Sequence, residues 1–147
     1  MSDTDWKEWN AHTIAEFRAN EGRVGGQFEG APIVLLHHQG RKSGTAFVTP
    51  VMYLPDDADQ DTIYVFASKA GAPEHPDWYR NISGTGRITV ERGTETYDVE
   101  VSELAGGERD RVYAEQASRF PGFAGYERKT EGVRTIPVLA LKRSAEV

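Results

Sequence analysis

The sequence predicts an α+β fold in which about six short antiparallel strands form a small β-barrel with helices packed outside it. Two observations favour this fold. Short apolar or alternating runs follow one another in hairpin-like pairs, and helical patterns are confined to the start, the middle and the last third of the chain. Because the strands do not alternate regularly with long helices, a doubly wound parallel sheet is disfavoured.

Length and composition are those of an ordinary globular domain. With 147 residues, 38% hydrophobic and 27% charged, residues 1–147 are expected to form one domain with a proper core. The chain has no cysteine, which excludes thiolate chemistry and fits a reducing cytosol. Its net charge of −6 disfavours nucleic acid as a partner, and no apolar run reaches the length of a membrane span.

The first 20 residues contain the expected N-terminal amphipathic helix, over residues 5–20. Trp6, Trp9, Ile14 and Phe17 recur on one face of a 3.6-residue period. The preferred interpretation is that this face packs on the core. Peripheral contact with a membrane is the alternative, disfavoured because acidic residues accompany the basic ones on the polar face.

Three strands are expected next, over residues 32–38, 46–54 and 62–68. The run Ile33–Leu36 is apolar throughout and is therefore expected to be buried on both faces. Pro50 lacks an N–H group, which predicts an edge position or a bulge. The glycine-rich segment 22–30 precedes a strand and lacks the spacing of a dinucleotide fingerprint, and residues 56–61 are expected to be an acidic hairpin turn.

The second half of the chain is expected to hold a short helix over residues 76–83, a hairpin of strands 87–91 and 95–103, and a helix over 107–120. A last strand is expected over 135–141. Between them, Phe120, Phe123 and Tyr126 recur every three residues. Periodicity alone weighs a core stripe and a binding surface about equally, and Pro121 with Gly122 favours a mobile segment over a cleft.

Two glycine-flanked turns carry cations beside hydroxyl groups. One holds Arg41, Lys42 and Ser43, and the other holds Ser68 and Lys69. Exposed backbone N–H groups in such turns, next to fixed positive charge, suit an anion such as a phosphate. Trp78 and Tyr79 follow as a flat surface for a ring. The sequence therefore indicates a site for a ligand with a phosphate and a ring.

Other chemistries find little support. His37 and His38 are neighbours on a predicted strand and point to opposite faces, and no metal-ligand spacing occurs, so no metal is expected. Neither Ser43 nor Ser68 lies in a nucleophile motif. If the protein is an enzyme, a bound cofactor is expected to supply the reaction chemistry.

The motifs together resemble the deazaflavin (F420)-dependent nitroreductase family, split β-barrel oxidoreductases that use coenzyme F420. They are Gly25-Gly-x-Phe, Gly40-Arg-Lys-Ser-Gly44 with Thr49-Pro50, Ala67-Ser-Lys-x-Gly71-Ala-Pro, Pro76-x-Trp-Tyr-x-Asn81, Glu108-Arg and Thr135-Ile-Pro137. Each motif is weak alone, but their order and spacing cover nearly the whole chain after Asn20.

The resemblance implies site residues position by position. The cofactor would be held by Arg41, Lys42, Ser43, Val48, Thr49, Pro50, Val51, Met52, Phe66, Ala67, Ser68, Lys69, Asp77, Trp78, Tyr79, Arg80, Asn81 and Phe123. Phe120, Phe123 and Tyr126 would line the substrate side, with Ser68 and Tyr126 as catalytic residues.

The implied activity is hydride transfer from reduced F420 to a small hydrophobic electrophile such as a quinone, an enone or a nitroaromatic. Two alternatives remain: a non-catalytic protein that stores the cofactor, and a split-barrel reductase that uses flavin mononucleotide (FMN).

This sequence departs from the family pattern in two ways. The first concerns cofactor affinity, because Phe47 occupies a position that is usually arginine in the family. The loss of that cation is expected to weaken binding by roughly 1.5–3 kcal/mol unless another cation replaces it. The second departure concerns substrate preference, which is expected to differ because Phe120 and Phe123 lack the hydroxyls of tyrosine-bearing relatives.

Overall fold

A closed antiparallel barrel forms the centre of the molecule. The computed structural model describes residues 3–25 and 31–144. Within this part the strands are β1 (Ile33–Gln39), β2 (Ala46–Pro55), β3 (Thr62–Phe66), β4 (Arg87–Arg92), β5 (Glu95–Glu103) and β6 (Val138–Arg143). They close in the order β1-β2-β3-β6-β5-β4, with every neighbouring pair antiparallel. The predicted fold class is confirmed.

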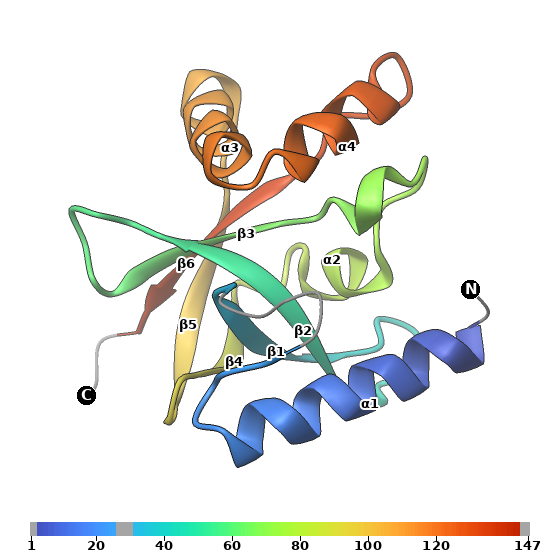
Figure 1. The fold of residues 1–147 in the computed structure, drawn as a ribbon, viewed down its shortest axis with the longest axis vertical. Coiled ribbons are helices and arrows are strands. Elements are labelled where there is room, and N and C mark those ends of the chain that lie inside the picture. Colours follow the sequence, from blue (N-terminus) through green and yellow to red (C-terminus); the bar gives the residue numbers. More distant parts are fainter. Residues whose placement is uncertain (1–2, 26–30, 145–147) are drawn as a thin grey trace.

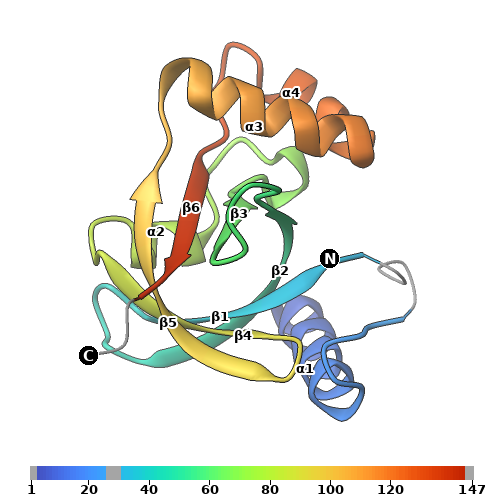
Figure 2. The ribbon, with the colours of Figure 1, turned by 90° about the vertical axis from the view of Figure 1, so that its left-hand side faces the viewer.

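The helices lie outside the barrel on two sides. They are α1 (Asp3–Ala19), the 3-10 turn η2 (Lys69–Gly71), α2 (Asp77–Ile82), α3 (Gly106–Arg119) and α4 (Gly122–Thr130). Figures 1 and 2 show α1 against the β1–β2 end and α3 with α4 at the opposite end, and η2 and α2 between them.

Strand β1 buries both faces because a helix covers its outer face. Val34 and Leu36 point into the barrel, where they join Trp78 of α2. The alternate residues Ile33 and Leu35 pack on α1. A continuous apolar run is the expected pattern for such a strand, and full burial of each side chain contributes about 1.5–3 kcal/mol. The burial predicted for residues 33–36 is confirmed.

Helix α1 packs on the barrel through part of its predicted apolar face. Phe17 is buried and Ile14 packs beside it, as predicted, whereas the side chain of Trp6 lies outside the described residues. Arg18 ties the helix to β4 through two hydrogen bonds to Glu91, of 2.7 and 3.1 Å. The Arg18 guanidinium lowers the pKa of the Glu91 carboxyl. In the described residues no helix combines the length and the apolar character needed to cross a membrane.

Strand β2 has an open edge at its first half. It pairs with β1 over residues 46–52, but with β3 only from Tyr53 to Pro55. Pro50 lies in the half that is paired on one side only, so the edge position predicted from its missing N–H is confirmed. Helix α2 lies near this edge, because its Asn81 contacts His38 and His38 contacts Thr49 of β2.

Three segments differ from the sequence-based expectation. Strand β3 ends at Phe66, because Lys69 and Ala70 adopt left-handed backbone angles and turn the chain. Strand β6 begins at Val138 and runs to Arg143, later than the predicted 135–141, and Pro137 before it accepts a hydrogen bond from Ala67 through its carbonyl. The aromatic segment, for which no element bounds were predicted, is helical: α3 ends at Arg119 and α4 begins at Gly122.

Candidate cofactor site

A chain of hydrogen bonds connects four elements at the open edge of β2. Asn81 of α2 accepts hydrogen bonds from the backbone N–H of Arg41 (3.1 Å) and from its guanidinium (3.3 Å). The Asn81 amide nitrogen contacts His38 Nδ1 at 3.0 Å, and His38 Nε2 contacts the Thr49 hydroxyl at 2.9 Å. His38 thus links Thr49 to Asn81, and Asn81 links this pair to Arg41. His38 itself was not among the residues predicted to hold the cofactor.

The loop before β2 presents free positive charge. Arg41, Lys42 and Ser43 are all exposed, and Lys42 has no partner among the described residues. The loop is tight, because a Cβ added at Gly40 would lie 2.6 Å from Ser43 Oγ. The Ser43 hydroxyl accepts the N–H of Thr45 at 3.2 Å. Exposed cations in a tight loop suit an anionic group, and the binding role of this loop stays a prediction.

The predicted contacts on β2 divide between two faces. Thr49 faces His38 and Val51 packs on the barrel interior, on the same side as Phe47, whose ring stacks on His38 at 5.6 Å. Val48 and Met52 pack on the other side, toward α1. Side chains alternate along a strand, so the five consecutive residues 48–52 cannot all point at one ligand.

The turn after β3 is held in an unusual conformation. Lys69 (φ 45°) and Ala70 (φ 53°) are left-handed, which costs about 1–3 kcal/mol per non-glycine residue unless the surroundings enforce it. Arg134 enforces it through hydrogen bonds to the carbonyls of Ala67 (3.0 Å), Ser68 (2.9 Å) and Ala72 (2.9 Å). Ser68 is right-handed and Lys69 left-handed, the alternation that turns successive N–H groups toward one side.

Arg134 also fixes the residues that follow the turn. Its guanidinium contacts His75 Nδ1 at 3.0 Å, and the His75 ring lies 4.9 Å from that of Tyr79. Burial lowers the pKa of His75, and the positive charge of Arg134 adds to this effect. The Tyr79 hydroxyl donates to Glu103 at 2.7 Å, so its hydrogen is already used within the protein.

The predicted cation Lys69 has a partner within the protein. Its ammonium group lies 2.8 Å from Glu74, and both side chains are about half exposed. Such an exposed pair contributes little to stability and opens readily. Lys42 is therefore the freer of the two predicted lysines.

Helix α4 packs directly on the turn. A Cβ at Gly71 would lie 3.2 Å from the Tyr126 Cα, and Lys129 donates to the Ala70 carbonyl at 3.3 Å. The predicted catalytic hydroxyls of Ser68 and Tyr126 therefore belong to segments in contact. Neither hydroxyl has a hydrogen-bond partner among the described residues, and both side chains are partly accessible.

Several predicted contact residues lie in the core instead. Trp78 is 8% exposed inside the barrel cluster, so it does not present a flat face to solvent. Phe123 packs edge-on against Phe66 and Tyr126, at ring distances of 5.7 and 5.2 Å. Phe120 lies at the margin of the same cluster, and Asp77 and Arg80 are exposed on α2.

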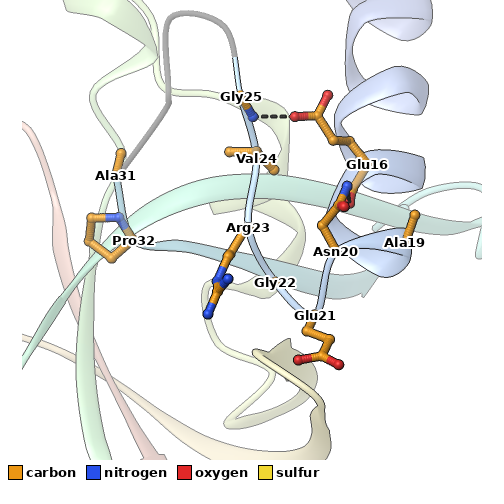
Figure 3. Close-up of a pocket in the computed structure, with 10 residues that line it drawn as sticks. All are labelled: Glu16, Ala19, Asn20, Glu21, Gly22, Arg23, Val24, Gly25, Ala31 and Pro32. Atoms are coloured by element: carbon orange, nitrogen blue, oxygen red, sulfur yellow. Dashed lines mark hydrogen bonds between the residues drawn. The ribbon is translucent and has the colours of Figure 1, made fainter.

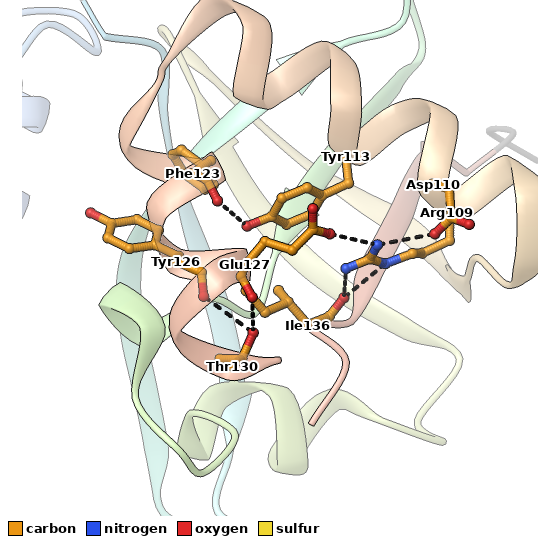
Figure 4. A network of polar contacts seen from close by, with 8 residues as sticks. All are labelled: Arg109, Asp110, Tyr113, Phe123, Tyr126, Glu127, Thr130 and Ile136. Carbon is orange, nitrogen blue, oxygen red and sulfur yellow. Dashed lines mark hydrogen bonds and ion pairs between the residues drawn. The ribbon is translucent and has the colours of Figure 1, made fainter. Parts of the chain in front are cut away.

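A polar network supports α4 from behind. Arg109 donates to the Ile136 carbonyl (3.0 and 3.1 Å) and to Glu127 (3.1 Å), and its guanidinium lies over the Tyr113 ring (Figure 4). Burial and Glu127 raise the pKa of Tyr113 to about 12, so its hydroxyl stays protonated and donates to the Phe123 carbonyl at 2.6 Å. The Tyr126 ring points away from this network (Figure 4).

Two cavities in the described part of the chain lie in different regions. One of about 1040 Å³ is lined by the end of α1 and the segment that follows it, where Glu16 accepts the N–H of Gly25 (Figure 3). None of the predicted site residues lines it. One of about 530 Å³ borders Arg109, Arg134 and the end of α4. In the described residues no cluster of three or more His, Asp or Glu side chains is arranged to hold a metal.

The residues present fit an anionic, ring-bearing cofactor at the open edge of β2. The donor set there consists of the exposed cations and hydroxyl of the 41–43 loop, with Thr49 and Asn81 beside it. The turn of Ser68 and Lys69 and the half-buried Tyr126 lie toward α4. His38 and Arg134 hold the two groups in place.

Known proteins resemble this chain in sequence and in fold. Residues 9–143 match the family model described as F420H(2)-dependent quinone reductase. A Mycobacterium tuberculosis protein provisionally named an F420H(2)-dependent quinone reductase is 32% identical over 121 residues, which cover 82% of this chain and 98% of that protein. A second protein of that organism, named F420H(2)-dependent quinone reductase, is 29% identical over 88% of this chain and 86% of its own length.

Solved structures agree with these matches. One described as an F420-H2 dependent reductase has a TM-score of 0.65 and 33% identity, and the alignment covers 76% of this chain and 94% of that one. The Vibrio cholerae heme-storage protein HutZ shares the fold with a TM-score of 0.56 at 16% identity. The chain belongs to the F420H(2)-dependent quinone reductase family and is, as its sequence predicted, an oxidoreductase that uses reduced coenzyme F420.

Proposed function

We propose that this protein transfers a hydride from reduced F420 to a quinone, with the cofactor lying along the open edge of β2. The carrying observation is that predicted contact residues from the 41–43 loop, β2 and α2 meet in one hydrogen-bonded group there. Nitroaromatics and enones are further electrophiles of the proposed substrate class.

In this proposal the 41–43 loop binds the anionic part of the cofactor. Lys42 is exposed and without a partner in the described part of the chain, and Arg41 is oriented by Asn81. Arg41 presents its remaining N–H groups, and Thr49 its hydroxyl hydrogen, for an anion. The exposed Ser43 supplies a further polar contact.

The other end of the proposed site performs the chemistry. Bound reduced F420 supplies the hydride, and the quinone also takes up one proton to become a hydroquinone. Backbone N–H groups of the Ser68–Lys69 turn and the Ser68 hydroxyl would stabilise negative charge that develops on the quinone oxygen. The Tyr126 hydroxyl, or solvent, would supply the proton. Phe120 and the accessible part of Phe123 would give this end an apolar lining, from the margin of the core cluster to which both belong.

Replacement of Lys42 with alanine is expected to raise the dissociation constant of F420 about tenfold, the effect of one lost charge-assisted contact. The affinity of the wild-type protein should also fall as salt is added. Lys142→Ala is the matched control, because Lys142 is an exposed lysine at the far end of β6, opposite Thr62. Equal dissociation constants in the Lys42→Ala and wild-type proteins would show that Lys42 is only a solvated surface residue.

Replacement of Tyr126 with phenylalanine tests the proton donor. The hydroxyl has no partner among the described residues, so its loss should leave stability within about 0.5 kcal/mol. If Tyr126 donates the proton, kcat should fall about 100-fold, within the range typical of general acids. The turnover number at saturating quinone is the measurement. An unchanged kcat assigns the proton to solvent.

The proposal also concerns location. A cysteine-free chain fits a reducing cytosol, and Ile14 and Phe17 of α1 pack on the barrel. The proposed substrate is nonetheless hydrophobic, and contact with a membrane surface stays the alternative. Sedimentation with anionic vesicles distinguishes the two, because a protein that works in the cytosol stays in the supernatant.

A direct binding experiment tests the proposed site. The protein is titrated with oxidised F420 and, separately, with flavin mononucleotide. The proposal expects saturable binding of F420 and much weaker binding of the flavin. A preference for flavin mononucleotide would contradict it.

A further inference from the structure

His38 lies buried at the junction of four elements of the proposed anion site. It is carried by β1 and is 8% exposed. One ring nitrogen contacts Asn81 of α2 and the other contacts Thr49 of β2, at 3.0 and 2.9 Å. Asn81 in turn holds the loop through Arg41.

The hydrogen bonds can run in only one direction. Asn81 Oδ1 accepts from two N–H groups of Arg41, so the amide NH₂ must face His38. His38 Nδ1 must therefore accept, which puts the imidazole proton on Nε2. That proton is donated to the Thr49 oxygen, and the Thr49 hydroxyl hydrogen is left free for an outside acceptor.

We propose that His38 is a positioning residue for the anionic part of the cofactor. As the neutral Nε2–H tautomer it fixes Arg41, Asn81 and Thr49 in the orientations that an anion requires. This inference rests on the proposed function, because it assumes that F420 binds at the open edge of β2. It concerns residues that orient the ligand contacts, and His38 itself touches neither cofactor nor substrate.

A second proton on His38 would undo this arrangement. Nδ1 would become a donor that faces the Asn81 amide donor, and turning the amide would set its NH₂ against the N–H groups of Arg41. Two charged groups lie near the ring, Asp77 on α2 and Arg41 of the loop, and β2 adds only the uncharged Thr49 and Phe47. His37 is the adjacent residue on β1 but points to the other side of the strand, so it acts on His38 only electrostatically.

The direction of the pH dependence follows from burial. Burial lowers the pKa of His38 below its usual 6.5. The electrostatic effect of His37 lowers it further, whereas that of Asp77 opposes the shift. The folded protein therefore binds this proton more weakly than the unfolded chain does. The stabilisation from the network is complete above about pH 6.5 and is lost as the pH falls below it.

Four variants separate the two hydrogen bonds. His38→Leu removes both of them. His38→Asn keeps an oxygen near the Nδ1 position for Asn81, and His38→Gln keeps an N–H near the Nε2 position for Thr49. His37→Asn is the control, because His37 is the adjacent histidine but points to the other side of β1, where it contacts Glu91 at 2.7 Å.

The first measurement needs no cofactor. An imidazole nitrogen–proton correlation spectrum of the wild-type protein should place the proton of neutral His38 on Nε2 and show its pKa below 6.5. A proton on Nδ1, or a His38 that is charged at neutral pH, would overturn the inference.

The second measurement is the dissociation constant of oxidised F420 at about pH 8 and about pH 5.5. His38→Leu should raise it about tenfold at the higher pH, while His37→Asn stays within about twofold of wild type. Wild-type binding should weaken at the lower pH, and the His38→Asn and His38→Gln proteins should lose most of that dependence. If the leucine variant does not fold, these two variants alone decide.

The outcomes separate this inference from the proposed function. Wild-type affinity retained in folded His38 variants, or tighter wild-type binding at the lower pH, would overturn the role of His38 alone. Failure of the wild-type protein to bind F420 would overturn the proposed site and this inference together.

Discussion

Replacement of Trp78 with alanine is expected to lower the free energy of unfolding by roughly 3–5 kcal/mol, the cost of emptying a large buried aromatic site. Trp78 is buried in the barrel core beside Val34, Leu36 and Ile82. The same substitution should weaken F420 binding, because Trp78 anchors α2 and α2 carries Asn81. Denaturant unfolding followed by circular dichroism measures the first effect.

Tyr79→Phe is the matched control for Trp78. It keeps a ring at the next position of α2 and removes only the hydrogen bond to Glu103, so its cost should stay near 1 kcal/mol. A Trp78→Ala protein as stable as wild type that no longer binds F420 would mean that the side chain is mainly a ligand contact.

Replacement of Arg134 with alanine is expected to have the largest effect on the site itself. It leaves the carbonyls of Ala67 and Ala72 without the Arg134 donor, at roughly 1–3 kcal/mol for each group that stays buried, while the Ser68 carbonyl keeps only the N–H of Gly71. The left-handed angles of the turn then lose their main support. We expect a stability loss of about 3 kcal/mol and an F420 dissociation constant raised more than tenfold.

Two further variants test Arg134. Arg134→Lys keeps the charge but lacks the planar fork, so it should rescue only part of the loss. Arg128→Ala removes an exposed arginine of α4 and should behave as wild type. Amide hydrogen exchange of Ser68 to Gly71 reports on the turn directly. Unchanged exchange and unchanged binding in Arg134→Ala would contradict the role assigned to this residue.

The fold was predictable from the sequence because the signals for strands are local. Alternation in the 95–103 strand and the apolar run of 33–36 predict their elements with little error. The start of β6 was not predictable in this way, because Thr135 and Ile136 are β-branched like strand residues. The Ile136 carbonyl instead accepts a hydrogen bond from the Arg109 side chain.

The candidate site was predictable only in part. The exposed cations of the 41–43 loop form a sequence motif, and resemblance identified Asn81 and Thr49. The residues that hold them in place leave no local pattern. His38 lies 43 positions from Asn81, and Arg134 lies 66 positions from Ser68, so both contacts exist only once the barrel has closed. The one available signal was the predicted hairpin of the first two strands, in which His38 pairs with Phe47 and Thr49 lies two residues further along the partner strand.

Hydride transfer to a quinone is measured by following the oxidation of reduced F420 with and without a quinone. Oxidation should be slow when protein or quinone is omitted. With both present oxidation should be rapid, and hydroquinone should form in an amount equal to the F420 oxidised. Tight binding of reduced F420 without quinone-dependent oxidation would contradict the account and indicate a protein that stores the cofactor.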